Sequence, residues 1–181
     1  MSKILGLADI RDWLKTLKIT ADDNYYIGKL NSKKDESIGV YPVFDNVFKI
    51  GTKGVDSEDA DMKTIADCET FSLSMDNNVE EWTPMTTEGW IRRMQTGKGF
   101  SISISGKRNV GDDGNDYVAS KLFATGKAVE SKFEWVFADG TTVKFDCLIS
   151  VSNAGTGDST NVAPLEFEVM SNGKPTVTPA A

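Results

Sequence analysis

The chain has 181 residues and a net charge of −7, with 39% hydrophobic residues, 26% charged residues and no histidine. This length fits one ordinary domain, which buries about two thirds of its unfolded surface when it folds. Without histidine, the chain lacks the most common general base, triad member and transition-metal ligand, which excludes most familiar hydrolase mechanisms. We therefore expect no catalytic residue, no cofactor and no metal site.

The distribution of charge and of apolar residues excludes further classes. Residues 1–43 contain 7 basic and 6 acidic residues, so residues 44–181 contain 13 basic (20 − 7) and 21 acidic (27 − 6) residues. This acidic balance argues against a protein that grips DNA through its phosphates. No run of about 18 apolar residues is present, and the apolar patch at the start is too brief for a secretory signal. We expect no membrane span and a protein that stays where it is made.

The first 42 residues are predicted to form a helix followed by a hairpin. The helical spacing i, i+3, i+4 and i+7 is met by Ile10, Trp13, Leu14 and Leu17. Asp9 precedes them as a suitable N-cap. Residues 25–30 and 37–41 have strand character and flank a polar stretch, which predicts a hairpin with a long loop. We expect residues 1–42 to be an N-terminal extension and residues 43–181 to be a β domain.

From residue 44 onward, alternating apolar and small polar residues predict half-buried antiparallel strands. The expected inward-facing sets are Phe71, Leu73 and Met75; Phe100, Ile102 and Ile104; and Leu165, Phe167 and Val169. The strongest hairpin signal is Asp139-Gly140 between the alternating segments 133–137 and 141–151. The predicted fold class is mainly β: an antiparallel barrel or sandwich of two packed sheets with one or two short flanking helices.

Two short helices and one loop are expected between these strands. Thr86 or Thr87 is predicted to cap a helix that carries Trp90, Ile91 and Met94 on its packed side and ends at Gly97. A second helix is expected over residues 117–125, with Asn115 or Asp116 as its cap and Gly126 as its stop. The acidic loop 52–61 has no apolar periodicity, and we expect it to be exposed and mobile until a partner binds it.

Cys68 and Cys147 lie in predicted strands. They form a disulfide only if those strands are neighbours, and two buried free thiols are the favoured reading. Two cysteines without histidine cannot supply the usual zinc ligand set.

Four motifs have a possible functional reading and a structural one. The segment DDGND (112–116) lacks the ligand spacing of an EF-hand, so a turn into a capped helix is favoured over calcium binding. The glycine-rich segment 153–160 lacks the Gly-Lys-Ser/Thr ending of a phosphate loop and is favoured as a strand connection. The acidic pairs at 80–81 and 166–168 resemble glycosidase carboxylates only in spacing, so solvated faces are favoured.

The fourth motif is the set of tryptophans Trp82, Trp90 and Trp135. A sugar-binding platform and core packing are both open, and core packing is favoured for all three, although only Trp90 and Trp135 lie on predicted inward faces.

Several segments together resemble the tail tube (major tail) proteins of long-tailed bacteriophages and related particles, over residues 43–178. They are VEEWTP (79–84), TEGW (87–90), GKR (106–108), GD (111–112), GNDY (114–117), FEW (133–135) and PLEFEV (164–169). The resemblance implies two packed β-sheets with a flanking helix, six copies in a ring, and rings stacked into a hollow tube through which DNA leaves the capsid. Residues 22–41 depart from it, because NYYIGKL (24–30) and KKDESIGVY (33–41) resemble the start of a phage minor capsid or tail terminator protein.

The resemblance also implies partners and a location. The partners are other copies of the chain, the terminator, tape measure and distal tail proteins, and DNA that passes without sticking. The location is the tail of a virion that is assembled in the bacterial host cytoplasm. The alternatives are a monomeric carbohydrate-binding β-sandwich and, with less support, a secreted hydrolase that works through carboxylates alone.

Two groups of site residues follow from these expectations. Residues expected between subunits are Arg92, Arg93, Trp82, Asp56, Glu58 and Asp59. Residues expected to line the lumen are Asp146, Glu166 and Glu168. The lumen residues are chosen because a channel for a polyanion must avoid clusters of Lys and Arg.

Overall fold

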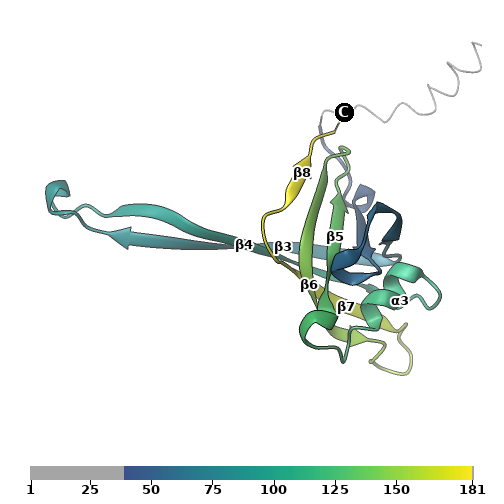
Figure 1. Ribbon diagram of the computed structural model, residues 1–181. Helices are drawn as coiled ribbons and strands as arrows, with labels where there is room; N and C mark the ends of the chain where they lie inside the picture. The colour runs from purple at the N-terminus through teal and green to yellow at the C-terminus, as the bar shows by residue number, and fades with distance from the viewer. Residues whose placement is uncertain (1–38, 181) are drawn as a thin grey trace, which may run out of the picture. The chain divides into compact units, whose positions relative to one another are not determined.

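The computed structural model describes residues 39–180, and from Pro42 onward they belong to one compact unit (Figure 1). The helix and hairpin expected near the N-terminus lie outside the described residues, apart from residues 39–41, so those predictions stay open. No helix among residues 39–180 is long and apolar enough to cross a membrane.

The unit is built almost entirely from strands. They are β1 (Val47–Gly51), β2 (Met62–Thr64), β3 (Cys68–Trp82), β4 (Arg92–Lys107), β5 (Glu130–Val136), β6 (Thr142–Ala154), β7 (Pro164–Ser171) and β8 (Thr176–Thr178). The helical segments are α3 (Asp113–Ala119) and the 3-10 turns η1 (Val43–Asp45), η2 (Gly54–Asp56), η3 (Asp59–Asp61), η4 (Met85–Thr87) and η5 (Gly126–Val129).

The strands form one open antiparallel sheet that folds back on itself. The strand order is β2-β1-β5-β6-β7-β4-β3. The short strand β8 pairs with residues 142–144 of β6, before the part of β6 that pairs with β7. The sheet is not closed into a barrel, but Phe71 of β3 packs against Phe48 of β1 and Trp135 of β5, with ring centroids 4.9 and 5.4 Å apart. Strands at opposite ends of the order therefore form two facing layers. The predicted mainly β, two-layer architecture is confirmed.

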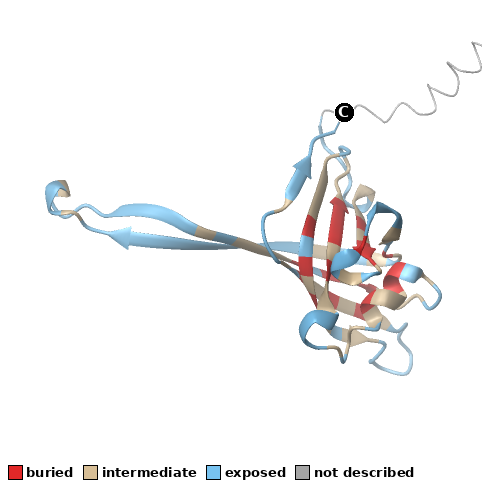
Figure 2. Cartoon of the chain, viewed as in Figure 1, coloured by how far each residue is buried: buried red, intermediate tan, exposed pale blue. Residues whose placement is uncertain are grey.

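The core lies between these layers and follows the predicted alternation (Figure 2). The buried hydrophobic residues are Phe48, Ile50, Ile65, Ile102, Ile104, Val118, Phe133, Trp135, Phe145, Cys147, Ile149, Leu165, Phe167 and Val169. The inward sets of β4 and β7 are thus largely confirmed. In β3 the prediction is wrong for Leu73 and Met75, which are 46% and 44% exposed, because within residues 39–180 no second layer covers that part of the strand.

The hairpin expected around Asp139-Gly140 is present as β5 and β6. Val136 pairs with Thr142, and the amide of Phe137 donates to the carbonyl of Thr141 at 2.8 Å. The loop therefore has three residues, not two, and Gly140 takes the left-handed conformation, φ 93°, that such a loop requires.

The helix expected after Thr86 is absent, and this prediction is wrong. Only the 3-10 turn η4 forms there; the chain then reverses at Glu88 and Gly89, with φ of 51° and 89°, and continues as β4. Pairing of β4 with β3 supplies the backbone hydrogen bonds that a helix would have supplied. Trp90 is 78% exposed, not packed on the core.

The second helix begins earlier than expected and has a different cap. The side chain of Asp112 accepts a hydrogen bond from the amide of Asn115 at 2.8 Å, so α3 starts at Asp113 and ends at Ala119. Asn115 lies inside the helix as a fully buried residue. Val118, on the same helix, is also fully buried and covers one end of the core.

The acidic loop 52–61 is mostly exposed, as expected, but it has contacts of its own that the prediction missed. It contains η2 and η3, and a capping box joins Glu58 with Asp61. Ser57 is 1% exposed, and its carbonyl accepts a hydrogen bond from Nζ of Lys132 at 2.8 Å. The sheet therefore holds this loop in place.

Both cysteines are free thiols, as favoured from the sequence. Burial raises the pKa of Cys68 to about 11 and that of Cys147 to about 12. Because the thiolate is the reactive form, both are unreactive near neutral pH.

Candidate interaction surfaces

A long hairpin, residues 76–99, projects beyond the rest of the sheet (Figures 1 and 2). In this part β3 and β4 are the only strands of residues 39–180 that pair with each other, because the ladder between β4 and β7 begins at the pair Ser101 and Met170. Nearly all its residues are exposed. A two-stranded ribbon has little stability alone in water, which makes this hairpin a candidate for contact with another molecule.

The loop at the end of the hairpin, residues 83–91, has a defined conformation. Oγ1 of Thr87 lies within hydrogen-bond distance of the carbonyl oxygens of Pro84, at 2.9 Å, and Trp90, at 2.7 Å, which share its one proton. The amide of Trp90 donates to the carbonyl of Thr87 at 2.9 Å. The large side chains that it presents, with Met94 beside it, are highly exposed: Met85 (102%), Trp90 (78%) and Met94 (59%).

Three residues expected at a subunit interface lie on this hairpin. Trp82 and Arg92 are register partners at the point where the strands end, and Trp82 is 41% exposed. Arg93 forms an exposed ion pair with Glu81, with 2.5 Å between its Nε and the carboxylate oxygen. Such a pair contributes about 0 to 1 kcal/mol.

The three tryptophans do not form one platform. Trp135 is in the core, where its indole Nε1 donates to Oδ1 of Asn46 at 2.8 Å. Only Trp82 and Trp90 are exposed, both on the hairpin. The expectation of core packing is confirmed for Trp135 and wrong for Trp82 and Trp90.

The other expected interface residues, Asp56, Glu58 and Asp59, lie in the acidic loop. Asp56 and Glu58 are exposed, whereas a carboxylate oxygen of Asp59 lies 2.8 Å from Nζ of Lys144. This hydrogen bond from Lys144 lowers the pKa of Asp59. Part of the acidic loop is therefore already paired with the sheet.

Lys144 also contributes to a charged cluster beneath the loop. Its Nζ lies 3.2 Å from Oε2 of the buried Glu134. Nζ of Lys49 lies 2.7 Å from Oε1 of the same carboxylate. Burial acts to raise the pKa of Glu134, but the bonds from the two lysines outweigh it, so the net pKa is lowered. The cluster joins β1, β5 and β6 and fastens the loop to them.

The three acids expected in the lumen share one face of the sheet, opposite to the core. Glu168 pairs with Ser103 on one side and Ser150 on the other, and Glu166 lies two residues before Glu168 on the same strand. The side chains around the two glutamates are small and polar: Thr70, Ser72, Ser103, Ser105, Ser150 and Ser152 line a hollow of about 480 Å³ with them. We call the surface around this hollow the serine–acid face. Asp146 lies outside the hollow, opposite Lys132 on β5 and close to Lys144.

An apolar groove of about 810 Å³ lies at the base of the hairpin, and sequence reasoning missed it. Its apolar lining comes from β3, β4, β8 and the β5–β6 hairpin: Leu73, Met75, Phe100, Trp135, Phe137, Val143, Pro175 and Val177. Lys98 and Lys174 are the charged residues in its lining. Only the apolar alternation of Leu73 and Met75 could have pointed to it, and that alternation equally predicts a core.

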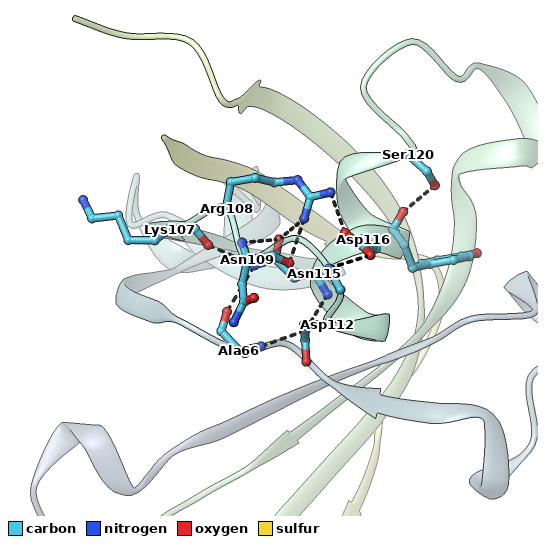
Figure 3. Close-up of polar contacts among 10 residues, drawn as sticks. Ala66, Lys107, Arg108, Asn109, Asp112, Asn115, Asp116 and Ser120 are labelled. Atoms are coloured by element: carbon cyan, nitrogen blue, oxygen red, sulfur yellow. Dashed lines mark hydrogen bonds and ion pairs between the residues drawn. The ribbon is translucent and has the colours of Figure 1, made fainter. Parts of the chain in front are cut away.

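The remaining motifs have structural roles. Figure 3 shows the segment 112–116 in a hydrogen-bond cluster around Asn115, where Asp112 caps the helix and Asp116 pairs with Arg108 at 2.5 Å. Among residues 39–180, no group of three or more His, Cys, Asp or Glu side chains is placed to hold a metal. The glycine-rich segment connects β6 to β7, with Asn153 closing a turn onto Thr156.

Comparison with known proteins gives a structural match and no sequence match. No protein-family model and no curated protein matches the chain. Its fold is similar to that of a chain in the tail of an empty gene transfer agent particle, refined with C6 symmetry (TM-score 0.63, 19% identity). The match covers 77% of this chain and 99% of the other chain. A second match is in the virion of a native gene transfer agent particle (TM-score 0.55, 21% identity, the same coverage of both chains).

A third match is in the extended sheath–tube complex of an extracellular contractile injection system (TM-score 0.52, 11% identity), with 80% of this chain and 95% of the other covered. The β domain therefore has the fold of chains in these tail, virion and sheath–tube structures, which agrees with the fold implied by the resemblance to tail tube proteins.

Proposed function

We propose that this chain is a structural subunit that assembles into six-membered rings, and that the rings stack into the hollow tail tube of a phage or phage-like particle. The observation that carries the proposal is the fold match across nearly the whole of a chain from a tail with C6 symmetry. In this proposal residues 43–181 build the tube wall and residues 1–42 are an added extension. The protein acts as a conduit for DNA and not as an enzyme.

The unpartnered edges and hairpin support self-assembly. The sheet order ends at β2 and β3, so each of these strands has one edge without a strand partner among residues 39–180. Exposed strand edges pair readily with other chains. Together with the projecting hairpin, they give one copy several surfaces that neighbouring copies can bury. We assign Arg92, Arg93, Trp82, Asp56, Glu58 and Asp59 to these contacts.

The serine–acid face supports a role as the wall of a DNA channel. Phosphate groups bind Lys and Arg strongly, so a channel for DNA needs walls without basic clusters. Glu166, Glu168 and the neighbouring serines provide a neutral to acidic surface that spans β3, β4, β7 and β6. Asp146 is assigned to the lumen with them, and the lysines beside it, Lys132 and Lys144, are already bound by Ser57, Asp59 and Glu134.

Replacing Glu166 and Glu168 by lysine tests the lumen assignment. Both side chains lie on the face away from the core, so tubes should still assemble, while DNA ejection should slow because lysines hold phosphates at every ring. The matched control reverses two exposed acids elsewhere, Asp113→Lys with Asp158→Lys. Normal ejection by particles with the lysine-walled tube would contradict the lumen assignment.

In the particle, the proposed partners are other copies of the chain, the terminator, tape measure and distal tail proteins, and DNA in passage. The proposed location is the virion tail, assembled in the cytoplasm of the bacterial host. Sedimentation velocity over a wide concentration range tests the self-assembly, with large species expected as concentration rises. A monomer at every concentration that binds oligosaccharides would favour the carbohydrate-binding alternative.

A further inference from the structure

The apolar groove is open to solvent although its lining is mostly apolar. Leu73, Met75 and Val177 are 46%, 44% and 56% exposed at its walls, and Phe100 and Phe137 lie deeper. A volume of about 810 Å³ is that of a site for a large organic group. Leaving these side chains in water is unfavourable, so an apolar occupant would be stabilised here.

The loop at the end of the hairpin presents side chains of the matching kind. Trp90 and Met85 protrude from a loop that Thr87 already holds in one conformation. A preformed loop loses little conformational entropy when it binds. Exposed tryptophan is also the residue type most enriched at interface hot spots.

The loop of a given copy cannot reach the groove of the same copy. Arg92, where β4 begins, is eight residues from Phe100 in the groove, which is about 26 Å along an extended strand. Loop and groove therefore lie at separate places along one two-stranded ribbon. A contact between loop and groove must therefore join two copies. Because the two surfaces differ, each copy still has a free loop or a free groove after one contact forms, so further copies can add to give rings or filaments.

The net charges at the two surfaces are opposite in sign. The groove has Lys98 and Lys174 in its lining, with no carboxylate there. The hairpin around the loop carries Glu80, Glu81 and Glu88 together with Arg92 and Arg93, and Arg93 is paired with Glu81. Two glutamates and one arginine remain, a net charge of −1 that faces the two lysines and helps to orient the contact.

We propose that Trp90 and Met85, at the hairpin tip of one copy, occupy the apolar groove between β3, β4 and β8 of the next copy. This inference rests on the proposed function and names the two surfaces that join consecutive subunits. It also accounts for the exposure of Leu73 and Met75, because the neighbouring copy supplies the layer that this part of β3 lacks.

Cysteine cross-linking between two differently tagged copies tests the contact directly. One copy carries Trp90→Cys and the other Met75→Cys, and the control pair replaces Met75→Cys by Val110→Cys, an exposed apolar residue outside the groove and the hairpin. Under mild oxidation, the first pair should form a cross-linked heterodimer and the control pair should not. The native thiols are buried enough to stay unreactive.

The same experiment separates this inference from the proposed function. Tubes that form without the cross-link from Trp90→Cys to Met75→Cys would overturn the contact and leave the tube function standing. A cross-link in preparations without tubes would support the contact and count against the tube function.

A second measurement uses the concentration at which assembly begins. Trp90→Ala should raise it about 30-fold or more, which is the effect of a hot-spot tryptophan. Phe123→Ala, at an aromatic residue outside the hairpin that is still more exposed (91%, against 78% for Trp90), should leave this concentration within about twofold. Equal effects of the two substitutions would overturn the proposal.

Discussion

Asn115 is the buried centre of a hydrogen-bond cluster that joins α3 to the end of β4 and to the connection between β2 and β3, and its removal gives the sharpest stability prediction. Its Nδ2 donates to the carbonyls of Ala66 at 3.2 Å and Lys107 at 2.9 Å (Figure 3). Its Oδ1 accepts from Arg108 at 2.8 Å and from the amide of Asn109 at 3.1 Å. Asn115→Ala removes all four bonds in a fully buried position.

The size of the loss follows from the groups left behind. Two carbonyls and one amide lose their bond to the side chain, while the guanidinium of Arg108 keeps the carbonyl of Asn109 at 2.9 Å and the carboxylate of Asp116 at 2.5 Å. A buried polar group without a partner costs about 1 to 3 kcal/mol. We therefore expect the free energy of unfolding to fall by about 3 to 5 kcal/mol, since water re-enters part of the site.

Urea denaturation of dilute protein, followed by tryptophan fluorescence, measures this loss. The matched control is Asn78→Ala, which removes one exposed bond to the hydroxyl of Thr96 at 3.1 Å and should cost about 0.5 kcal/mol. If Asn115→Ala cost no more than this control, the reasoning about the buried cluster would be wrong.

Three further predictions concern the fold and its assembly. Gly114→Ala should destabilise the protein by about 1 to 3 kcal/mol although alanine favours helices, because the added Cβ would meet the carbonyl oxygen of Thr64 at 2.3 Å; increased stability in urea would contradict this contact. Because the pKa of Glu134 is lowered from its usual value of 4.5, its ionised form stabilises the fold above pH 4.5, and this contribution disappears as pH falls through the lowered pKa. Glu134→Gln should therefore make the free energy of unfolding depend less steeply on pH in the acid range. An unchanged slope would count against the cluster. Arg92→Glu with Arg93→Glu should leave a monomer that is folded, as circular dichroism would show, and that assembles poorly, as sedimentation would show. If this variant formed normal tubes, neither arginine would be an interface residue.

Much of the fold could be predicted because local patterns and tertiary contacts agree there. The β5–β6 hairpin combines clean alternation with a strong turn signal, and β4 and β7 place their predicted apolar residues in the core. The helix expected after Thr86 shows the opposite case. The helical spacing of Trp90, Ile91 and Met94 is real, but residues 92–97 pair with the outer part of β3, which local sequence does not reveal.

The candidate surfaces were predictable only in part for the same reason. Glu166 and Glu168 share a face because they are two residues apart on a strand, but Asp146 joins them only through the register of β6 with β7. The apolar groove depends on β8, a three-residue strand, and on the absence of a layer over Leu73 and Met75. Alternation predicts which side chains share a face and does not predict what covers that face.

Electron microscopy of the purified full-length chain tests the central claim most directly. We expect hollow tubes or rings with six-fold symmetry and a diameter of about 100 Å, as six domains each about 30 to 40 Å wide would give. In a map of such tubes, the serine–acid face should line the bore. Dispersed single copies at every protein concentration, without rings or tubes, would contradict the account.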